Sequence, residues 1–323
     1  MTYKVLIGSK TFGKITSEPE EILRKEGYEI IHNPYPEFFN EKQLIDAIRD
    51  VDAMVVGFDE VTENVLERAS KLKVLAKHGV GVDNIDITAA TKHRIIVCNT
   101  VGANESGVAD LAIGLMISVA RQIPFANREV KNQKWPKVFG TELWEKTLGI
   151  VGLGHIGKGV AIRAHGFSMT VLAYDPYPDK QFADRHGIQF VTLEELLQKA
   201  DFVTIHVPLN KDTKNMIGKK QLAMMKESAF LINTARGEIV NEESLYTALK
   251  EKLIRGAALD AFALEPAGAS KILEIDSLIA TPHMGAYTEE SLNRMSLMCA
   301  RAIVAVLKGL KPDFVVNPEI YEE

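Results

Sequence analysis

The glycine pattern G-x-G-x-x-G at Gly152, Gly154 and Gly157 constrains the fold of this chain more than any other feature. A short buried strand is predicted just before it, over 147–151, and a helix just after its first glycines, over 155–165. In this setting the first glycine makes a tight turn, the second lets the backbone approach a pyrophosphate, and the third lets the helix pack against the strand. Glycine triplets are common in loops, but this context indicates a dinucleotide-binding βαβ unit.

The residues that follow complete this unit. A second strand is predicted over 169–174, and Asp175 stands at its end. Its carboxylate can accept hydrogen bonds from a ribose diol and would repel a 2′-phosphate, so we expect NAD rather than NADP as the cofactor. The N-terminus of the intervening helix offers unpaired N–H groups to the phosphates. A βαβ unit that binds no ligand is the structural alternative.

Length and composition exclude several classes of protein. The chain has 323 residues, which predicts about two domains. Its 38 basic and 43 acidic residues give a net charge of −5 without a basic run, so we expect no nucleic-acid partner. Two cysteines are too few for a disulfide framework, and Cys98 and Cys299 lie among apolar residues, which favours buried thiols over a catalytic or metal-binding role. With no apolar run near about 18 residues and no signal-peptide pattern, we expect no membrane span and a cytoplasmic protein.

Strand-like and helix-like segments alternate through the first third of the chain, which predicts one doubly wound parallel sheet. Residues 17–20 have the pattern of a capping box with a proline in the first turn. The strands are expected over 4–7, 28–31, 53–56, 74–76 and 95–98.

A long helix is predicted from Asn104 to about Arg121, and its middle, 108–116, is nearly all apolar. Such a helix is buried between layers or in an interface. Because so much apolar surface is seldom left exposed, we also expect a homodimer.

A second alternating set of segments follows and ends in an amphipathic helix from Thr288 to about Leu310. Thr192 and Asn241 are the predicted caps of two of its helices. Six strands with intervening helices form a full dinucleotide-binding domain. They are expected over 147–151, 169–174, 201–206, 229–233, 255–259 and 277–281.

Three blocks that follow predicted strands each contain one reactive side chain, namely Arg236, Glu265 and His283. Ligands bind beyond the carboxyl ends of the strands in an open parallel sheet, so these blocks should converge near the cofactor. The arginine fork suits a carboxylate or polarised carbonyl, and histidine exchanges protons near neutral pH. The glutamate can hold the imidazole in one tautomer and favour its charged form. Beside a nicotinamide, these residues predict hydride transfer coupled to proton transfer at a carbonyl or carbinol.

Each of these residues also has a structural interpretation when taken alone. Arg236 fits a surface or salt-bridge arginine, Glu265 a loop residue before a proline, and His283 is one of eight histidines. Their joint placement at successive strand ends favours the functional interpretation. His206, at the end of another predicted strand, fits an adenine-side contact and a core position about equally well.

Seven blocks carry a resemblance to a known family. They are residues 79–86, 101–110, the glycine motif, 206–209, the Asn-Thr-Ala-Arg-Gly block, the Leu-Asp-Ala-Phe…Glu-Pro block and Thr-Pro-His-Met-Gly-Ala. In this order they resemble the NAD-dependent D-2-hydroxyacid dehydrogenase family, in particular its phosphoglycerate dehydrogenase-like branch. The resemblance implies two doubly wound parallel-sheet α/β domains, with a Rossmann cofactor domain inserted into a flavodoxin-like substrate domain and the active site in the cleft between them. The substrate-binding domain would comprise 1–100 and 288–323, and the NAD-binding domain 101–287.

The resemblance also implies roles for individual residues. Arg236 would bind the substrate carboxylate and carbonyl oxygen, His283 would be the acid/base, and Glu265 would pair with it. Backbone N–H groups around Val80 and Gly81 would hold the carboxylate. The cofactor residues would be the three motif glycines, His155 and Ile156 at the pyrophosphate, Asp175 at the adenosine ribose, His206, Ala235, and, toward the nicotinamide, Thr234, Asp260, Gly285 and Ala286.

The implied substrate is a small 2-hydroxy or 2-oxo acid, with D-3-phosphoglycerate dehydrogenase of serine biosynthesis as an alternative. Phosphoglycerate dehydrogenases resemble one another in an arginine before the Val-Thr pair, here Val61-Thr62, but residues 55–60 contain two acids and no arginine. Because an acidic loop repels phosphate, an unphosphorylated acid such as hydroxypyruvate or glyoxylate, or a sugar-derived acid, is expected at least as much. Lys77 and His78 are the residues that would offset the acids. An NAD-sensing corepressor of the same fold is a further alternative.

Overall fold

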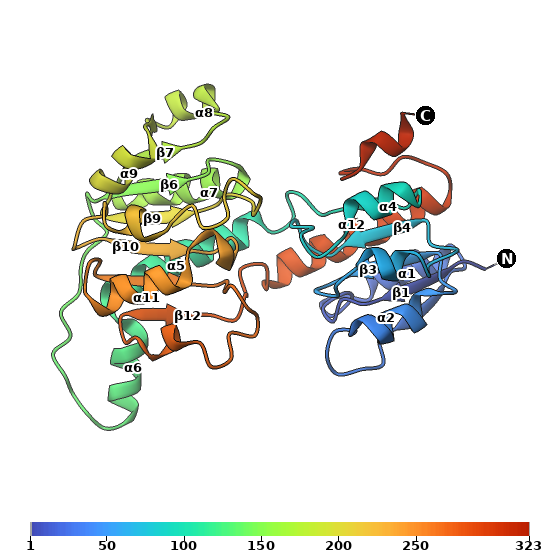
Figure 1. Cartoon of the computed structure of the whole chain (residues 1–323), viewed down its shortest axis with the longest axis horizontal. Helices are drawn as coiled ribbons and strands as arrows, with labels where there is room; N and C mark the ends of the chain where they lie inside the picture. Colours follow the sequence, from blue (N-terminus) through green and yellow to red (C-terminus); the bar gives the residue numbers. More distant parts are fainter. Residues whose placement is uncertain (1, 323) are drawn as a thin grey trace. The chain divides into compact units, whose positions relative to one another are not determined.

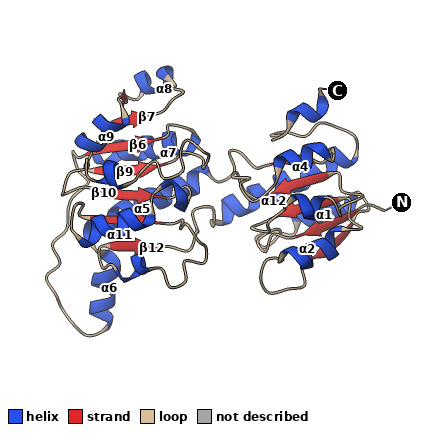
Figure 2. Cartoon of the chain, in the orientation of Figure 1, coloured by secondary structure: helices blue, strands red, loops and turns tan. Residues whose placement is uncertain are grey.

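The computed structural model describes residues 2–322 and divides the chain into two α/β units. The first unit is formed by Met1–Asn104 together with Ala286–Glu323, and the second is Glu105–Gly285. Each unit contains a wholly parallel sheet with helices packed on it (Figures 1 and 2). The predicted class, two doubly wound parallel-sheet units, is therefore confirmed, whereas the functional labels of the two units stay predictions.

The first unit has a five-stranded sheet in the order β2-β1-β3-β4-β5. This is the flavodoxin-like order, in which the chain reverses direction across the sheet between β1 and β3. The strands are β1 (Lys4–Ile7), β2 (Glu29–His32), β3 (Ala53–Val56), β4 (Val74–Lys77) and β5 (Ile96–Cys98), and the helices are α1 (Glu18–Lys25), α2 (Glu41–Ile48), α3 (Glu63–Leu66), α4 (Ile87–Lys92), α12 (Glu289–Leu307) and the short η4 (Pro318–Tyr321).

Both faces of this sheet are buried, as the near-continuous apolar strands predict. On β1, Val5 and Ile7 point into a core that also contains Leu23 of α1 and Ile303 of α12. Leu6, between them, points to the opposite face and its core with α2, α3 and α4. The period of two along a strand therefore places α1 and α12 on one face and the other three helices on the second.

The second unit has a seven-stranded sheet in the order β12-β11-β10-β9-β6-β7-β8. The sequence predicted six of these strands and missed β8, which has two residues. The strands are β6 (Thr147–Val151), β7 (Thr170–Tyr174), β8 (Gln189–Phe190), β9 (Phe202–Ile205), β10 (Phe230–Asn233), β11 (Gly256–Leu259) and β12 (Leu278–Ala280). The helices are α5 (Glu105–Arg121), α6 (Ile123–Lys131), α7 (His155–Ala164), α8 (Lys180–Arg185), α9 (Leu193–Lys199), α10 (Lys219–Leu222), α11 (Glu242–Lys250) and the short η1 (His165–Phe167), η2 (Gly237–Ile239) and η3 (Lys271–Glu274).

Six strands of this sheet end in a single row. The last residue of β6 pairs with the last residues of β7 and β9, and the pairing continues in the same register through β10 and β11 to β12. Parallel strands present their carboxyl ends at the same edge, so the segment after each strand begins at this edge. The row is Tyr174, Val151, Ile205, Asn233, Leu259 and Ala280.

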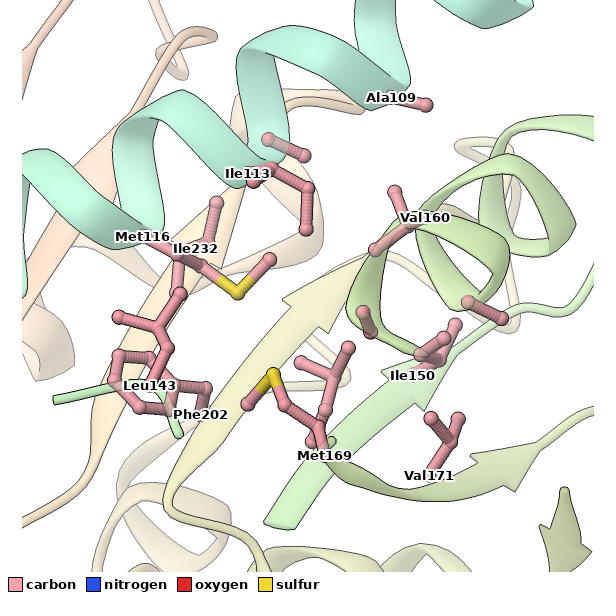
Figure 3. Packing of buried hydrophobic residues seen from close by; sticks show 14 of the residues in the cluster. Ala109, Ile113, Met116, Leu143, Ile150, Val160, Met169, Val171, Phe202 and Ile232 are labelled. Atoms are coloured by element: carbon pink, nitrogen blue, oxygen red, sulfur yellow. The ribbon is translucent and has the colours of Figure 1, made fainter. Parts of the chain in front are cut away.

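Helix α5 is buried within the second unit. Nine of its 17 residues are buried, and it packs against α7 and against β10 and β11. Figure 3 shows Ile113 and Met116 of α5 in one core with Ile232 and Phe202 of the sheet. Of the two predicted locations, between layers or in an interface, the structure selects the first, and the apolar face of α5 is covered by its own unit.

The segment after α5 was not predicted as a helix. Helix α6 follows α5 at an angle of 62° and has no buried residue. We define the arm as residues 122–144; it contains α6 and a long loop that project from the layers of this unit (Figure 1). Its exposed apolar side chains are Ile123, Val130, Trp135, Phe139 and Trp144, of which Trp135 is 88% exposed.

Among residues 2–322, no single helix is long and apolar enough to cross a membrane. The bent pair α5 and α6 meets the length and composition criteria only when taken together.

Of the predicted helix caps, two are confirmed and one is wrong. The hydroxyl of Thr192 accepts a hydrogen bond from the N–H of Glu195, and Asn241 caps α11 in the same way. Ser17 has helical backbone angles and no capping hydrogen bond; its hydroxyl donates to Glu21 instead. The extended backbone that a capping side chain needs is therefore present at Thr192 and absent at Ser17.

This difference predicts unequal effects of alanine at the two positions. Thr192→Ala should lower the free energy of unfolding by about 1 kcal/mol because it removes a cap. Ser17→Ala should change it by less than about 0.5 kcal/mol because an exposed hydroxyl is lost. Urea unfolding of both variants measures the two values, and equal losses would contradict the structural assignment.

Candidate functional site

The three motif glycines have different structural requirements. Gly152 has a φ of 94°, and a Cβ atom there would lie 2.7 Å from the carbonyl oxygen of His206. A Cβ atom on Gly157 would lie 2.1 Å from the carbonyl oxygen of Gly152. At Gly154, the N-cap residue of α7, no atom lies within 4 Å of the position that a Cβ atom would take. The fold itself thus requires the first and third glycines, whereas the second leaves the helix N-terminus open, as close approach of a dinucleotide phosphate demands.

Asp175 lies beside the glycine turn. Its carboxylate accepts one hydrogen bond from the N–H of Leu153 and one from the N–H of Tyr177, both 2.8 Å long. These bonds fix the carboxylate at the end of β7 while each oxygen keeps further lone-pair capacity for a hydroxyl donor. The geometry fits a ribose diol.

His155 begins α7 with a side chain that is 71% exposed, and its Nδ1 lies 3.3 Å from a carboxylate oxygen of Glu105. That oxygen is buried and makes no hydrogen bond within the described residues 2–322. The contact is an ion pair only when the histidine is protonated. Glu105 was not among the residues expected at this site. Ile156, the next residue, packs against the core under α5 and α7.

His206 directly follows β9. Its Nε2 lies 2.9 Å from the hydroxyl of Thr204, a fully buried strand residue. Burial lowers the pKa of His206 to about 3, so this imidazole is neutral at physiological pH. The contact with Thr204 anchors the ring at the end of β9, and a contact of His206 with the adenine side stays a prediction.

The loop after β10 is held by a residue that the sequence analysis passed over. Asn233, fully buried, donates to the carbonyl of Arg236 and accepts from the N–H of Ala235. A Cβ atom on Gly237 would lie 1.9 Å from the carbonyl carbon of Phe262, so only glycine allows the loops after β10 and β11 to touch. An asparagine at a strand end before an arginine and a glycine is the signal that could have indicated this arrangement.

Thr234, the residue after Asn233, is buried, and its hydroxyl oxygen makes no hydrogen bond with any described residue. Unpaired buried hydroxyls are costly, so such a group suits a site that a ligand completes.

Asp260 holds the loop that contains His283. Its carboxylate is fully buried and accepts from the hydroxyl of Thr281 and from the N–H groups of Met284 and Gly285. Within this loop His283 has a φ of 52°, which is unusual for a residue other than glycine and is sustained only by surrounding contacts. Whether Asp260 also touches the cofactor stays a prediction.

Glu265 and His283 form a hydrogen-bonded pair. Nδ1 of His283 lies 2.7 Å from one carboxylate oxygen of Glu265, and the other oxygen accepts from the N–H of Phe262. Partial burial favours the neutral acid, but the hydrogen bond and charge of His283, the N–H of Phe262 and the charge of Arg236 outweigh it and lower the pKa of Glu265. The glutamate is therefore ionised and keeps a proton on Nδ1 of the imidazole.

The predicted carboxylate-binding residues Val80 and Gly81 belong to the first unit, after β4. The carbonyl of Gly79 accepts from the N–H and hydroxyl of Thr100, and the carbonyl of Val80 accepts from the side chain of Asn99. The N–H groups of Val80 and Gly81 make no hydrogen bond within the described chain. Ala286 also belongs to this unit, at the start of its second segment.

The acidic loop after β3 differs from its prediction. Asp59 is fully buried and accepts from the N–H groups of Phe39 and Gly57, so its charge does not face solvent. Of the two acidic residues of this loop, Glu60 is the exposed one. The argument that two acids repel a phosphate is therefore wrong for Asp59, because the carboxylate is used to join two loops.

The comparisons with known proteins agree with one another. Residues 113–285 match the family model described as "D-isomer specific 2-hydroxyacid dehydrogenase, NAD binding domain". The chain is 45% identical over 288 residues to a D-3-phosphoglycerate dehydrogenase of Methanocaldococcus jannaschii. The aligned region covers 88% of this chain and 55% of that protein. It is 40% identical to a glyoxylate reductase of Korarchaeum cryptofilum, which covers 87% of each chain. The chain thus spans about half the length of this phosphoglycerate dehydrogenase and of that of Synechocystis sp..

A solved structure of related sequence has the same fold. The NAD⁺-bound 3-phosphoglycerate dehydrogenase of Entamoeba histolytica is 32% identical to this chain, with a TM-score of 0.83 over 98% of this chain and 99% of that one.

The glycine geometry makes a prediction that separates folding from cofactor binding. Gly154→Ala should leave the melting temperature unchanged, because its Cβ meets no atom, yet weaken NADH binding at least about tenfold by blocking close approach of the pyrophosphate. Gly157→Ala should lower the melting temperature, because its Cβ would overlap the carbonyl of Gly152. Thermal unfolding and NADH fluorescence titration measure both effects. Wild-type NADH affinity in Gly154→Ala would contradict the assignment.

Proposed function

The chain belongs to the D-isomer-specific 2-hydroxyacid dehydrogenases, and on this premise we propose that it transfers a hydride between NAD(H) and C2 of a D-2-hydroxy acid or its 2-oxo acid. The observation that carries this proposal is the pair of Glu265 and His283 at the edge where the strands of the second unit end. The same edge carries the open glycine turn and Asp175. An acid/base pair beside a dinucleotide site is what a coupled hydride and proton transfer requires.

Different residues of the chain have different roles in the proposed reduction of a 2-oxo acid. NADH, when bound, supplies the hydride that C2 accepts. Because Nδ1 of His283 faces the ionised Glu265, Nε2 is the nitrogen that donates a proton to the carbonyl oxygen. Arg236 binds the carboxylate and stabilises the negative charge that develops on that oxygen, a contribution of about 2–4 kcal/mol for donors of this kind. In the first unit, the N–H groups of Val80 and Gly81, which have no partner within residues 2–322, are the proposed donors to a substrate carboxylate.

We propose NAD rather than NADP as the cofactor. Asp175 lies at the ribose position of the motif, and its carboxylate, fixed by two backbone N–H groups, would repel a 2′-phosphate.

For the substrate we propose a small unphosphorylated 2-oxo acid, with the phosphorylated acid as the second candidate. The exposed Glu60 disfavours a phosphate near the loop after β3. The second candidate is supported by Lys77, a buried cation at the carboxyl end of β4 that donates to Gly57 and Asn84. Relatives of both kinds are similar to this chain.

NADH oxidation followed by absorbance tests the activity and the substrate together. Glyoxylate, hydroxypyruvate, pyruvate and 3-phosphohydroxypyruvate are compared, with NADPH in parallel. Turnover of an unphosphorylated acid with NADH supports the proposal, and preference for 3-phosphohydroxypyruvate selects the second candidate. Tight NADH binding without turnover of any acid would favour a cofactor-sensing binding protein.

The catalytic assignment predicts the behaviour of two variants. His283→Ala and Arg236→Ala should each lower kcat/KM at least about 10²-fold, because proton donation or carboxylate binding is lost. NADH affinity should persist in both, since neither residue lies at the glycine turn. His165→Ala, which changes an exposed histidine of the same unit, is the control and should keep wild-type kinetics. Loss of NADH binding in His283→Ala or Arg236→Ala would count against these roles.

We also propose that the protein is a homodimer and that the arm is the surface that contacts the second copy. Because the apolar face of α5 is covered by its own unit, the proposal rests on the arm instead. The arm has no buried helix residue and exposes two tryptophans and a phenylalanine, an apolar surface that monomers seldom leave in water. The expected cytoplasmic location stays a prediction.

Charge placed on the arm should separate the two copies. Trp135→Glu and Phe139→Glu are expected to shift the molar mass measured by light scattering from that of a dimer to that of a monomer, because a buried unpaired carboxylate is costly at an interface. Leu310→Glu, at a residue that is 61% exposed in the first unit, is the matched control and should not change the mass. A monomeric wild type, or arm variants that stay dimeric, would refute this surface.

A further inference from the structure

A buried imidazole in the first unit has no part in the function proposed above. His78 directly follows β4 and is 9% exposed. Its ring nitrogens lie 2.9 Å from the hydroxyl of Ser296 on α12 and 3.4 Å from the hydroxyl of Thr11 in the loop after β1. The ring of Phe12 packs edge-on against the imidazole, with the two ring centroids 6.3 Å apart.

The partners determine the tautomer of His78. Ser296 donates its hydroxyl proton to the carbonyl of Leu292, one turn earlier in α12, so its oxygen accepts from Nε2–H of His78. Nδ1 of the neutral ring is then an acceptor, which matches the hydroxyl of Thr11. A doubly protonated ring would have no nitrogen that accepts the hydroxyl proton of Thr11. Burial lowers the pKa of His78 to about 4, in agreement with a neutral ring.

This chain of hydrogen bonds connects three elements at one point of the sheet edge. Helix α12 lies along β4 (Figure 1), and Thr11 belongs to the loop after β1. Ser9 extends the chain through a 3.2 Å contact with Thr11. The backbone N–H of His78 is also used, since it donates to the carbonyl of Val56 on β3. His78 is therefore fixed at both its backbone and its side chain.

The segment that starts at this fixed point is Gly79–Gly81. Its carbonyl groups at Gly79 and Val80 are held by Thr100 and Asn99, and the N–H groups of Val80 and Gly81 have no partner within the described residues. The direction of these N–H groups thus depends on the contacts of Asn99 and Thr100 and on the orientation of His78, the residue that directly precedes the loop.

We propose that His78 is a positioning residue that, through Ser296 and Thr11, fixes the loop Gly79–Gly81 so that its N–H groups bind the substrate carboxylate. This inference rests on the proposed function, because it assumes that a 2-oxo acid is bound there. His78 does not touch the reacting atoms. Its loss should therefore weaken substrate binding more than it slows the chemical step.

The test compares steady-state reduction by four variants of the full chain with the best substrate of the wild type. Ser296→Ala and His78→Leu remove the bond between α12 and the imidazole, and each should raise KM for the 2-oxo acid about tenfold, equivalent to about 1.4 kcal/mol. In both, kcat should stay within about twofold of the wild type, and the Kd for NADH should not change. Ser296→Thr, which keeps the hydroxyl, should restore the wild-type KM.

Cys299→Ala is the matched control. Cys299 lies on the same buried side of α12, with its thiol against the carbonyls of Ala76 and Lys77 on β4, but it has no part in the His78 chain. This variant reports the effect of loosening the packing of α12 on β4 alone, and its KM should equal that of the wild type. The melting temperature of each variant shows whether it folds. If His78→Leu does not fold, Ser296→Thr still tests the hydrogen bond.

Three results would overturn the inference. A KM in Ser296→Ala equal to that in Cys299→Ala would show that the hydrogen bond does not position the loop. An equal rise of KM in Ser296→Ala, Ser296→Thr and Cys299→Ala would show a packing effect. A wild type that reduces no 2-oxo acid would overturn the proposed function and this inference with it, whereas an active wild type with an unchanged Ser296→Ala overturns the inference alone.

Discussion

The register of the parallel ladder in the second unit is the constraint on which its functional edge depends. Six strands end in one row, from Tyr174 to Ala280, so the residues that follow them begin at the same level of the sheet. A slip of one residue in any strand would turn its side chains to the other face and move its loop away from this edge. The buried faces of the sheet prevent such a slip, because both consist of apolar cores that fit only one register.

The loops at that edge are positioned by buried polar side chains rather than by apolar packing. Asp260 receives three hydrogen bonds from the loop of His283, and Asn233 spans the loop of Arg236. Each of these buried groups would be costly without its partners, so the loop conformations that satisfy them are strongly favoured. This explains how His283 is held in a left-handed conformation that its own backbone disfavours. The first unit uses the same device, with Asp59 joining two loops and His78 joining α12 to β4.

The elements predicted correctly from the sequence are those whose signals are local. The glycine turn, the strand before it and the cap at Thr192 depend on residues within a few positions of one another, and all three have the predicted form. Ser17 has the same local pattern as Thr192 but lacks its extended backbone, so the pattern was necessary and not sufficient. Helix α6 was missed because none of its residues is buried in its own unit, so no core position marks it in the sequence. The chemical types at the strand ends were predictable, since arginine, glutamate and histidine each follow an apolar strand.

The sequence by itself determined the doubly wound fold of each unit, the family and the identity of the reactive side chains, because periodicity and short motifs encode these features within short stretches of chain. Only the tertiary structure decided the distances and atoms at which side chains far apart in sequence meet. Glu265 and His283 are 18 residues apart, and His78 and Ser296 are 218 apart. It also decided that Asp59 is buried, that α5 faces its own sheet and that the hydroxyl of Thr234 is unpaired. The physical reason is that burial and pairing are set by residues distant in sequence, whose approach depends on the packing of the whole unit rather than on any local pattern.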